Sequence, residues 1–337
     1  MNKRFRSRII LLMILGVLMI AVKSSDGTIN DNGNLSVQLI PQLEEVAHIA
    51  DTGGDTFQAI ADGDILFVMD MLAGLKLYNI SDPINPTLMD SYYDGGLAHD
   101  MHKVGDLLFM ADHYDGLEIY NISNPFVITQ LGTITDDGDG EMDGVYVKDE
   151  LAYIAEWHDS SWDWSMKIIN VTDPTSPVEI TEYTDEDNEF ARFFVRDNIC
   201  YTACVESGFK ILNVTNPNSI EEIASYNLAY SWEFQVIDDL AYVTDGSGIR
   251  ILDISALETP TSLDFYNARR LCFGIEVIDD IAYIAEDEKG LRILNVSDPN
   301  NIFRIAQFDT EDVTNVEVQD DLIFLTMHEY GLLILKV

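Results

Sequence analysis

The sequence contains few basic residues, and this shortage limits its possible partners. It has 19 Lys and Arg residues against 59 Asp and Glu residues, which gives a formal net charge of −40 at pH 7. Because nucleic-acid affinity depends on cationic side chains that contact phosphates, the charge argues against a DNA or RNA partner. Apolar residues nevertheless make up 47% of the chain, enough for a folded core, so the sequence does not have the composition of a disordered protein.

Cysteines are also scarce, with three in the whole chain. Cys200 and Cys204 fall on one predicted strand, too far apart along it to bridge, and Cys272 belongs to a different part of the sequence. We predict that all three are buried as small apolar residues and form no disulfide framework.

Common catalytic motifs are missing as well. The sequence has no Gly-x-Ser-x-Gly, no phosphate-binding P-loop, no Gly-x-Gly-x-x-Gly after a predicted strand and no His-Glu-x-x-His. A catalytic group assembled from residues far apart in the sequence stays open.

The N-terminus carries the longest apolar run. Residues 9–22 are uninterrupted by polar side chains and follow a basic segment, which predicts a signal peptide over residues 1–24 or an uncleaved signal anchor. Residues 25–38 are expected to form a flexible leader. We therefore expect an exported protein, extracellular or at the cell surface, that is held to a membrane only if residues 9–22 remain attached.

The rest of the chain is organised by an internal repeat. An aromatic residue between apolar neighbours recurs seven times, at spacings of 41 to 48 residues, at Phe67, Phe109, Tyr153, Tyr201, Tyr242, Tyr283 and Phe324. Each unit also contains a Gly-led or Ser-led strand that alternates in polarity, such as residues 290–295, and further short extended runs. Four strands per unit with no helical period predict an all-β fold, a seven-bladed β-propeller with four antiparallel strands per blade.

The two ends of the repeat complement each other. The seventh unit stops at Val337 without a fourth strand, whereas residues 41–51 precede the first unit and match the fourth strands of other units. We predict that this N-terminal strand closes the last blade, so that the propeller spans residues 39–337 and has no exposed sheet edge.

The repeat resembles a known family. Residues 290–299 read Gly-Leu-Arg-Ile-Leu-Asn-Val-Ser-Asp-Pro and follow Ala-Tyr-Ile-Ala-Glu at 282–286, and together they are similar to the LVIVD repeat of bacterial and archaeal surface proteins. The resemblance covers the chain from residue 39 onward and implies a β-propeller. It implies no enzyme activity, because this family has no assigned catalytic residues.

Equivalent positions in the seven units suggest which residues face the mouth of the central channel. Polar residues recur nine and seven positions before the repeated aromatic, for example Asp100 and Glu317, and we expect them on the ligand-binding face. Acidic residues also recur three positions after the aromatic. Because they occupy the same position in most blades, we expect most of them to accept hydrogen bonds from backbone N–H groups of their own blade.

Tryptophans and one arginine are the predicted ligand-binding residues. The third unit carries an insertion with three of the four tryptophans, and rings interspersed with polar groups are typical of sugar or protein recognition. The alternative is that these rings pack against a neighbouring blade. The predicted set is Trp157, Trp162, Trp164 and Trp232, with Arg192 as an anion anchor.

Histidines cluster in the second and third units, which suggests a transition-metal site. Imidazole and carboxylate ligands suit an ion such as Zn²⁺, Mn²⁺ or Fe²⁺, although an ordinary polar lining would use the same residues. The candidate ligands are His99, His102, His113, Asp112 and Glu156.

An acidic stretch in the third unit suggests a second cation. Its side chains alternate as in calcium loops, at Asp137, Asp139, Glu141 and Asp143, but Lys148 stands where an EF-hand requires Glu. The alternatives are a Ca²⁺ site and a solvated acidic loop.

Two functions are therefore left open by the sequence. The first is an exported, non-catalytic scaffold that binds a protein or a surface glycan at its acidic channel mouth. The second is a metal-dependent extracellular hydrolase or lyase with a His and carboxylate site in blades 2 and 3. Surface acidity that only adapts the protein to salt is a third idea.

Overall fold

The computed structural model describes residues 28–29, 35–36, 43–50, 52–93, 95–113, 115–135, 140–158, 161, 163–184 and 189–337. The chain divides into two units, residues 1–42 and residues 43–337. In the first unit, β1 (Thr28–Ile29) pairs antiparallel with β2 (Leu35–Ser36). The predicted signal segment, residues 1–24, lies outside the described residues. Among the residues that are described, no helix is long and apolar enough to span a membrane.

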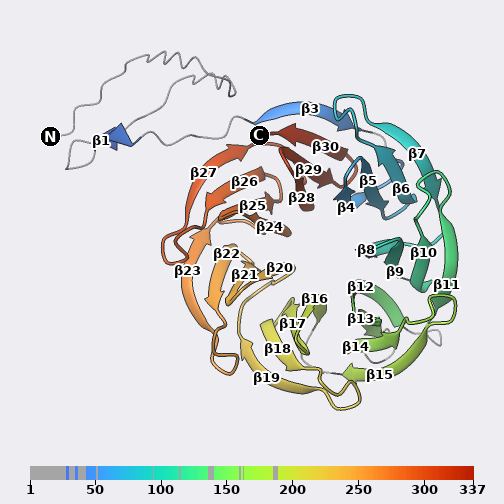
Figure 1. Ribbon diagram of the computed structural model, residues 1–337. Helices are drawn as coiled ribbons and strands as arrows, with labels where there is room; N and C mark the ends of the chain where they lie inside the picture. The colour runs from blue at the N-terminus through green and yellow to red at the C-terminus, as the bar shows by residue number, and fades with distance from the viewer. Residues whose placement is uncertain are drawn as a thin grey trace, which may run out of the picture. The chain divides into compact units, whose positions relative to one another are not determined.

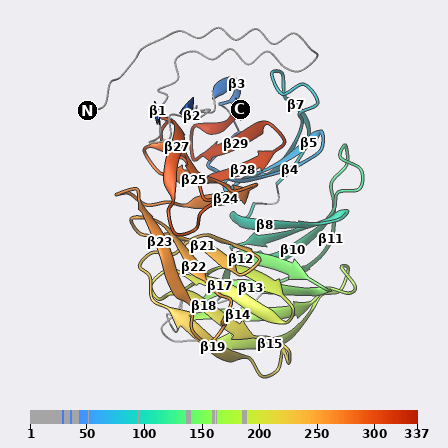
Figure 2. The same ribbon diagram turned by 60° about the vertical axis from the view of Figure 1, so that its left-hand side comes forward.

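The second unit is a ring of seven four-stranded antiparallel sheets, which confirms the predicted seven-bladed β-propeller (Figures 1 and 2). The first strand of each blade lies innermost and the fourth outermost. Blades 1 to 3 consist of β4 (Thr56–Asp62), β5 (Ile65–Asp70), β6 (Gly74–Asn79) and β7 (Thr87–Tyr92); β8 (Ala98–Val104), β9 (Leu107–Asp112), β10 (Gly116–Asn121) and β11 (Thr129–Ile134); and β12 (Gly140–Lys148), β13 (Leu151–His158), β14 (Asp163–Asn170) and β15 (Val178–Thr184). Blades 4 to 6 consist of β16 (Phe190–Arg196), β17 (Ile199–Cys204), β18 (Gly208–Asn213) and β19 (Glu221–Tyr226); β20 (Phe234–Ile237), β21 (Leu240–Asp245), β22 (Gly248–Asp253) and β23 (Thr261–Asn267); and β24 (Gly274–Ile278), β25 (Ile281–Glu286), β26 (Gly290–Asn295) and β27 (Phe303–Phe308). Blade 7 consists of β28 (Asn315–Gln319), β29 (Leu322–Met327), β30 (Gly331–Lys336) and, from the other end of the chain, β3 (Glu44–Ile49).

Blade 7 is completed by the N-terminal strand, as the sequence predicts. Strand β3 runs antiparallel to β30, with Glu44 opposite Lys336 and Ile49 opposite Leu332, and both views place it beside the C-terminus (Figures 1 and 2). Apolar side chains of β3 pack on the core that blades 7 and 1 share. The ring is closed by strand pairing, so blade 7 has four strands like the other blades and the edge of β30 is covered.

The core lies between neighbouring blades. Six of the seven repeated aromatics are buried, and Tyr283 is partly exposed. Each second strand is almost entirely buried because it has neighbours on both sides of its sheet, and this explains why these strands read as continuous apolar runs in the sequence.

The turn after each third strand explains the repeated Asn-x-Ser/Thr sequences. The Asn79 side chain accepts a hydrogen bond from the backbone N–H of Ser81 at 2.9 Å, and Asn295 does the same for Ser297 at 3.2 Å. Such Asx turns end the strand without any need for a glycan. Gly290 begins a third strand at a φ of 83°, where a Cβ atom would lie 2.4 Å from the carbonyl oxygen of Phe308, so only glycine fits there.

The cysteines are buried and free, as predicted. Cys200 and Cys204 lie at opposite ends of the same strand, β17. Burial raises the pKa of the Cys200 thiol far above its usual range, which keeps it in the unreactive protonated form.

Candidate ligand site at the mouth of the channel

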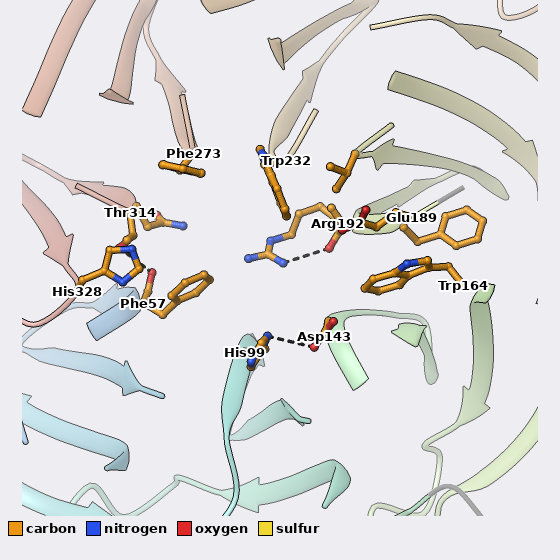
Figure 3. A pocket seen from close by; sticks show the side chains of 14 residues that line it. Phe57, His99, Asp143, Trp164, Glu189, Arg192, Trp232, Phe273, Thr314 and His328 are labelled. Carbon is orange, nitrogen blue, oxygen red and sulfur yellow. Dashed lines mark hydrogen bonds and ion pairs between the residues drawn. The ribbon is translucent and has the colours of Figure 1, made fainter. Parts of the chain in front are cut away.

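A pocket of about 380 Å³ lies at the mouth of the central channel, and every blade contributes to it (Figure 3). One ring position supplies half of its lining, the residue ten positions before the repeated aromatic. All seven side chains at this position line the pocket, and they hardly repeat from blade to blade: Phe57, His99, Asp143, Ala191, Trp232, Phe273 and Thr314.

In blades 1 to 4 this position is a β-bulge. The register between the first and second strands shifts so that Phe57, His99, Asp143 and Ala191 are each the extra, unpaired residue. A bulge changes the direction of its side chain relative to the regular strand alternation. In blades 5 to 7 the same position lies one or two residues before the first strand, and it lines the pocket without a bulge.

The ring seven positions before the aromatic, expected on the ligand face, serves the contacts between blades instead. His102 Nδ1 accepts the backbone N–H of Val147 at 2.9 Å, and Glu317 Oε1 accepts that of Ala61 at 3.0 Å. The same bond joins Tyr146, Gln235 and Glu276 to the first strand of the next blade. These polar side chains satisfy backbone groups of the inner strands, so their role is structural.

Arg192 lines the pocket as predicted, but its guanidinium group already forms ion pairs with two carboxylates. Its Nε lies 3.2 Å from Glu233 Oε2, and its Nη1 lies 3.6 Å from Asp100 Oδ2. Burial raises the pKa of Glu233 to about 7 although the arginine opposes this, and burial also raises the pKa of Asp100. The guanidinium is therefore less available to an anionic ligand than its position alone suggests.

The predicted tryptophans do not all reach the pocket. Trp164 and Trp232 line it from blade 3 and from the segment before β20. Trp157 lies outside the lining and packs on Trp164, with ring centroids 5.3 Å apart and an interplanar angle of 50°. Trp162 lies outside the described residues.

Two polar groups at the pocket lack a matching partner among the described residues. The indole Nε1 of Trp232 is buried without a hydrogen bond. Burial, together with the nearby Glu206 and Asp143 carboxylates, raises the pKa of Glu189. Glu189 therefore offers an acceptor to a ligand, whereas the indole nitrogen is too deeply buried to meet one in this position of the ring.

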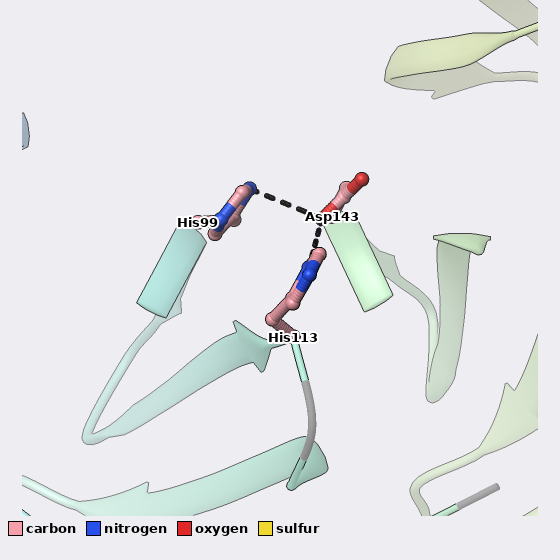
Figure 4. A group of neighbouring side chains, drawn as sticks. All are labelled: His99, His113 and Asp143. Atoms are coloured by element: carbon pink, nitrogen blue, oxygen red, sulfur yellow. Dashed lines mark hydrogen bonds and ion pairs between the residues drawn. The ribbon is translucent and has the colours of Figure 1, made fainter. Parts of the chain in front are cut away.

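The structure does not bring the predicted metal ligands together in one place. His99 and His113 come together with Asp143, a residue of the acidic stretch that predicts a calcium loop (Figure 4). His102 lies apart from them against Tyr146, and burial lowers its pKa to about 4. The other predicted ligands also lie elsewhere, since Asp112 accepts the backbone N–H of Leu97 at 2.7 Å and Glu156 bonds to Lys167.

Of the predicted calcium ligands, two are described. Glu141 and Asp143 lie on β12, where both contact His113, at 2.9 and 3.0 Å. Burial alone would lower the pKa of His113, but these carboxylates raise it. Asp137 and Asp139 lie outside the described residues.

A family model supports the repeat assignment. The model described as LVIVD repeat matches five segments, residues 53–94, 95–135, 139–185, 230–267 and 273–310, which together cover more than half of the chain. Blade 4, the blade of Arg192, falls between the matched segments. No curated protein matches the sequence.

Solved structures share the fold at low sequence identity. The WD40 β-propeller domain of Doa1 is 12% identical, with a TM-score of 0.69, and the match covers 88% of this chain and 97% of that one. The Neurospora crassa Pan2 WD40 domain is 9% identical, with a TM-score of 0.64 and coverages of 87% and 95%. The computationally designed Ika8 protein is 8% identical, with a TM-score of 0.64 and coverages of 87% and 99%. At these identities the similarity concerns the fold alone.

Proposed function

Because this chain belongs to the LVIVD repeat family and folds as a seven-bladed β-propeller, we propose that it is an exported, non-catalytic scaffold that binds a sugar ring of a surface glycan in the axial pocket. The observation that carries this proposal is the ring of residues ten before the repeated aromatic. The blades repeat closely in their strands, whereas this position varies and, unlike the other variable positions of the first strand, lines the pocket in every blade. A position that varies within a repeated frame is where a scaffold places its specificity.

The chemistry of the lining favours a sugar. Phe57, Trp164, Trp232 and Phe273 present flat apolar rings, and the Glu189 carboxyl group supplies a polar partner. A sugar ring offers C–H groups on its faces and hydroxyls at its rim, so it can use both kinds of contact. The volume lies within the range of pockets that take small ligands, roughly 300 to 1,000 Å³. A protein partner would instead require a broad interface of about 800 Å² on each side.

The charges indicate which sugars fit. The chain carries a net charge of −40, and its pocket arginine is already accompanied by Asp100 and Glu233. Glu189 and Asp143 add two carboxylates to the lining. We therefore expect neutral or amine-bearing sugars to bind and acidic sugars to be repelled.

The location belongs to the proposal as well. The basic segment and the apolar run over residues 9–22 support export, which would bring the pocket to surface glycans.

An oligosaccharide array tests this function. The labelled full chain is applied to printed neutral, amine-bearing and acidic oligosaccharides, beside the variants Trp164→Ala and Trp232→Ala. Since an aromatic anchor contributes about 2 kcal/mol or more, each variant should weaken capture at least about 30-fold. Phe126→Ala is the matched control, because this ring is 66% exposed and lies outside the pocket. Capture of no oligosaccharide, or equal capture by the pocket variants, would refute the glycan-binding function.

A further inference from the structure

Two histidines converge on one carboxylate oxygen in the wall of the pocket (Figure 4). The Nδ1 atoms of His99 and His113 each lie 3.0 Å from Oδ1 of Asp143. The imidazole rings are nearly parallel, with centroids 4.8 Å apart and an interplanar angle of 13°. His99 and Asp143 are the bulged residues of β8 and β12, and His113 directly follows β9, so two blades build the cluster.

These spacings suit metal coordination. Ligand atoms that bind one ion at about 2.1 Å lie about 3.0 to 3.4 Å apart in octahedral or tetrahedral geometry. Both nitrogen-to-oxygen distances are 3.0 Å, and the three ligand atoms lie within 4.8 Å of one another. Small rotations of the two rings would bring the nitrogens to coordination distance.

A second carboxylate supports the orientation of His113. Glu141 Oε2 lies 2.9 Å from His113 Nε2, on the side of the ring away from Asp143. Metal-bound histidines usually donate their other ring N–H to such a carboxylate, which fixes the tautomer and leaves the free nitrogen for the ion. His113 therefore has both a ligand-facing nitrogen and the support that a metal ligand needs.

We propose that His99, His113 and Asp143 bind one divalent transition-metal ion of the Zn²⁺, Mn²⁺ or Fe²⁺ type. Two imidazole nitrogens favour such ions over Ca²⁺, which prefers oxygen ligands. Three protein ligands leave at least one coordination position for water or for a bound ligand. His99 and Asp143 line the pocket, so that position faces the cavity. This proposal does not depend on the glycan-binding function, because the three protein side chains can coordinate the ion when no sugar is present.

A second cluster, which lies entirely in blade 3, provides the comparison. Glu156, His158 and Glu182 also place ligand atoms within 4.8 Å of one another. However, Lys167 Nζ lies 2.9 Å from Glu156 Oε1 and 2.7 Å from its Oε2. The ammonium group occupies the place of a cation there, so we expect the second cluster to bind no ion.

Metal titration of the purified full chain tests the proposal. The protein is stripped with a chelator and titrated with ZnCl₂ by calorimetry, and CoCl₂ is used to record the absorption of the bound ion. We expect one high-affinity ion per chain, a cobalt spectrum typical of nitrogen and oxygen ligands, and a higher unfolding temperature with metal. Asp143→Asn and His113→Gln should each lower the affinity at least 100-fold.

The control variants are His158→Gln and Glu182→Gln, which change the second cluster and should bind metal like the parent. Circular dichroism and the unfolding temperature without metal establish that each variant is folded. Two results would overturn the site: no stoichiometric metal uptake by the parent, or uptake that folded Asp143→Asn and His113→Gln chains retain. In either case the cluster would be a histidine–carboxylate ion pair without a metal.

Discussion

Two regions of the ring place buried carboxylates in different surroundings. Near the pocket, in blades 2 to 5, buried carboxylates form ion pairs with basic side chains. Arg192, for example, pairs with both Asp100 and Glu233. At the seam where blades 6, 7 and 1 meet, Glu276 and Glu317 accept the backbone N–H groups of Val318 and Ala61. No salt bridge reaches these two glutamates among the described residues.

The difference separates two ways to stabilise the same ring. A buried carboxylate near the pocket has a cationic partner whose charge opposes the effect of burial on its pKa, so its stability depends on that partner. A carboxyl group at the seam has only a backbone donor, and burial raises the pKa of Glu276 to about 8 and that of Glu317 to about 7. The pocket region should thus be sensitive to the loss of a cation, and the seam should be sensitive to pH and to the closing strand.

The largest expected effect comes from removing the closing strand. Deletion of residues 44–49 exposes the edge of β30 and removes the apolar side chains of β3 from the core of blades 7 and 1. The loss should exceed about 5 kcal/mol, which is comparable with the whole stability of many domains, and the chain should aggregate. Size-exclusion chromatography and thermal unfolding measure this.

The control for that deletion keeps the strand and changes only its exposed carboxylates. Glu44→Ser combined with Glu45→Ser should leave a monomer with an unfolding temperature close to that of the parent. A monomeric, equally heat-stable deletion variant would contradict closure by β3.

A smaller loss is expected from Lys167→Met near the pocket. This change leaves the Glu156 carboxylate, which is 0% exposed, without its ammonium partner. Removing one partner of a buried ion pair typically costs about 3 to 5 kcal/mol. Urea unfolding at pH 7 should show a loss of about 3 kcal/mol.

The double variant Lys167→Met with Glu156→Gln separates pairing from packing. It removes both charges, so it should recover most of the lost stability. If the double variant is as unstable as the single one, packing of the lysine stem accounts for the loss, and pairing does not distinguish the pocket region from the seam.

The architecture was predictable because the sequence repeats it. The recurring aromatic, the turn after each third strand and the unmatched fourth strand at residues 41–51 are local patterns, and they were sufficient to predict seven blades and their closure. The physical reason is that every blade solves the same packing problem, so the same residue types recur.

The site was only partly predictable, because it consists of what does not repeat. The acidic neighbours of Asp143 in the sequence predict a calcium loop, whereas the fold brings Asp143 to His99 and His113 of the preceding blade. The bulges that direct these side chains have no simple sequence signal. Aligning the seven units by their aromatic does not identify the pocket ring either, because the positions nine and seven before the aromatic vary as much as the position ten before it.

The smallest expected effect is a gain in stability at the seam. Glu317 faces Glu276, which in turn lies near Tyr283, and no cation balances them among the described residues. The pKa values of both glutamates are raised in the folded state, so the folded protein binds protons more strongly than the unfolded chain does. Their stabilising protonated form is complete below pH 4.5 and is lost as the pH rises toward 8. Glu317→Gln keeps the oxygen that accepts the Ala61 N–H and removes this loss. We expect about 1 to 2 kcal/mol of added stability at pH 8, no change at pH 4.5, and a flatter pH profile in urea unfolding.

Gln235 occupies the equivalent position between blades 5 and 6, so Gln235→Glu is the reverse control and should lower stability at pH 8. Parallel pH profiles for the parent and both variants would show that the seam carboxyls titrate normally and that the two regions do not differ.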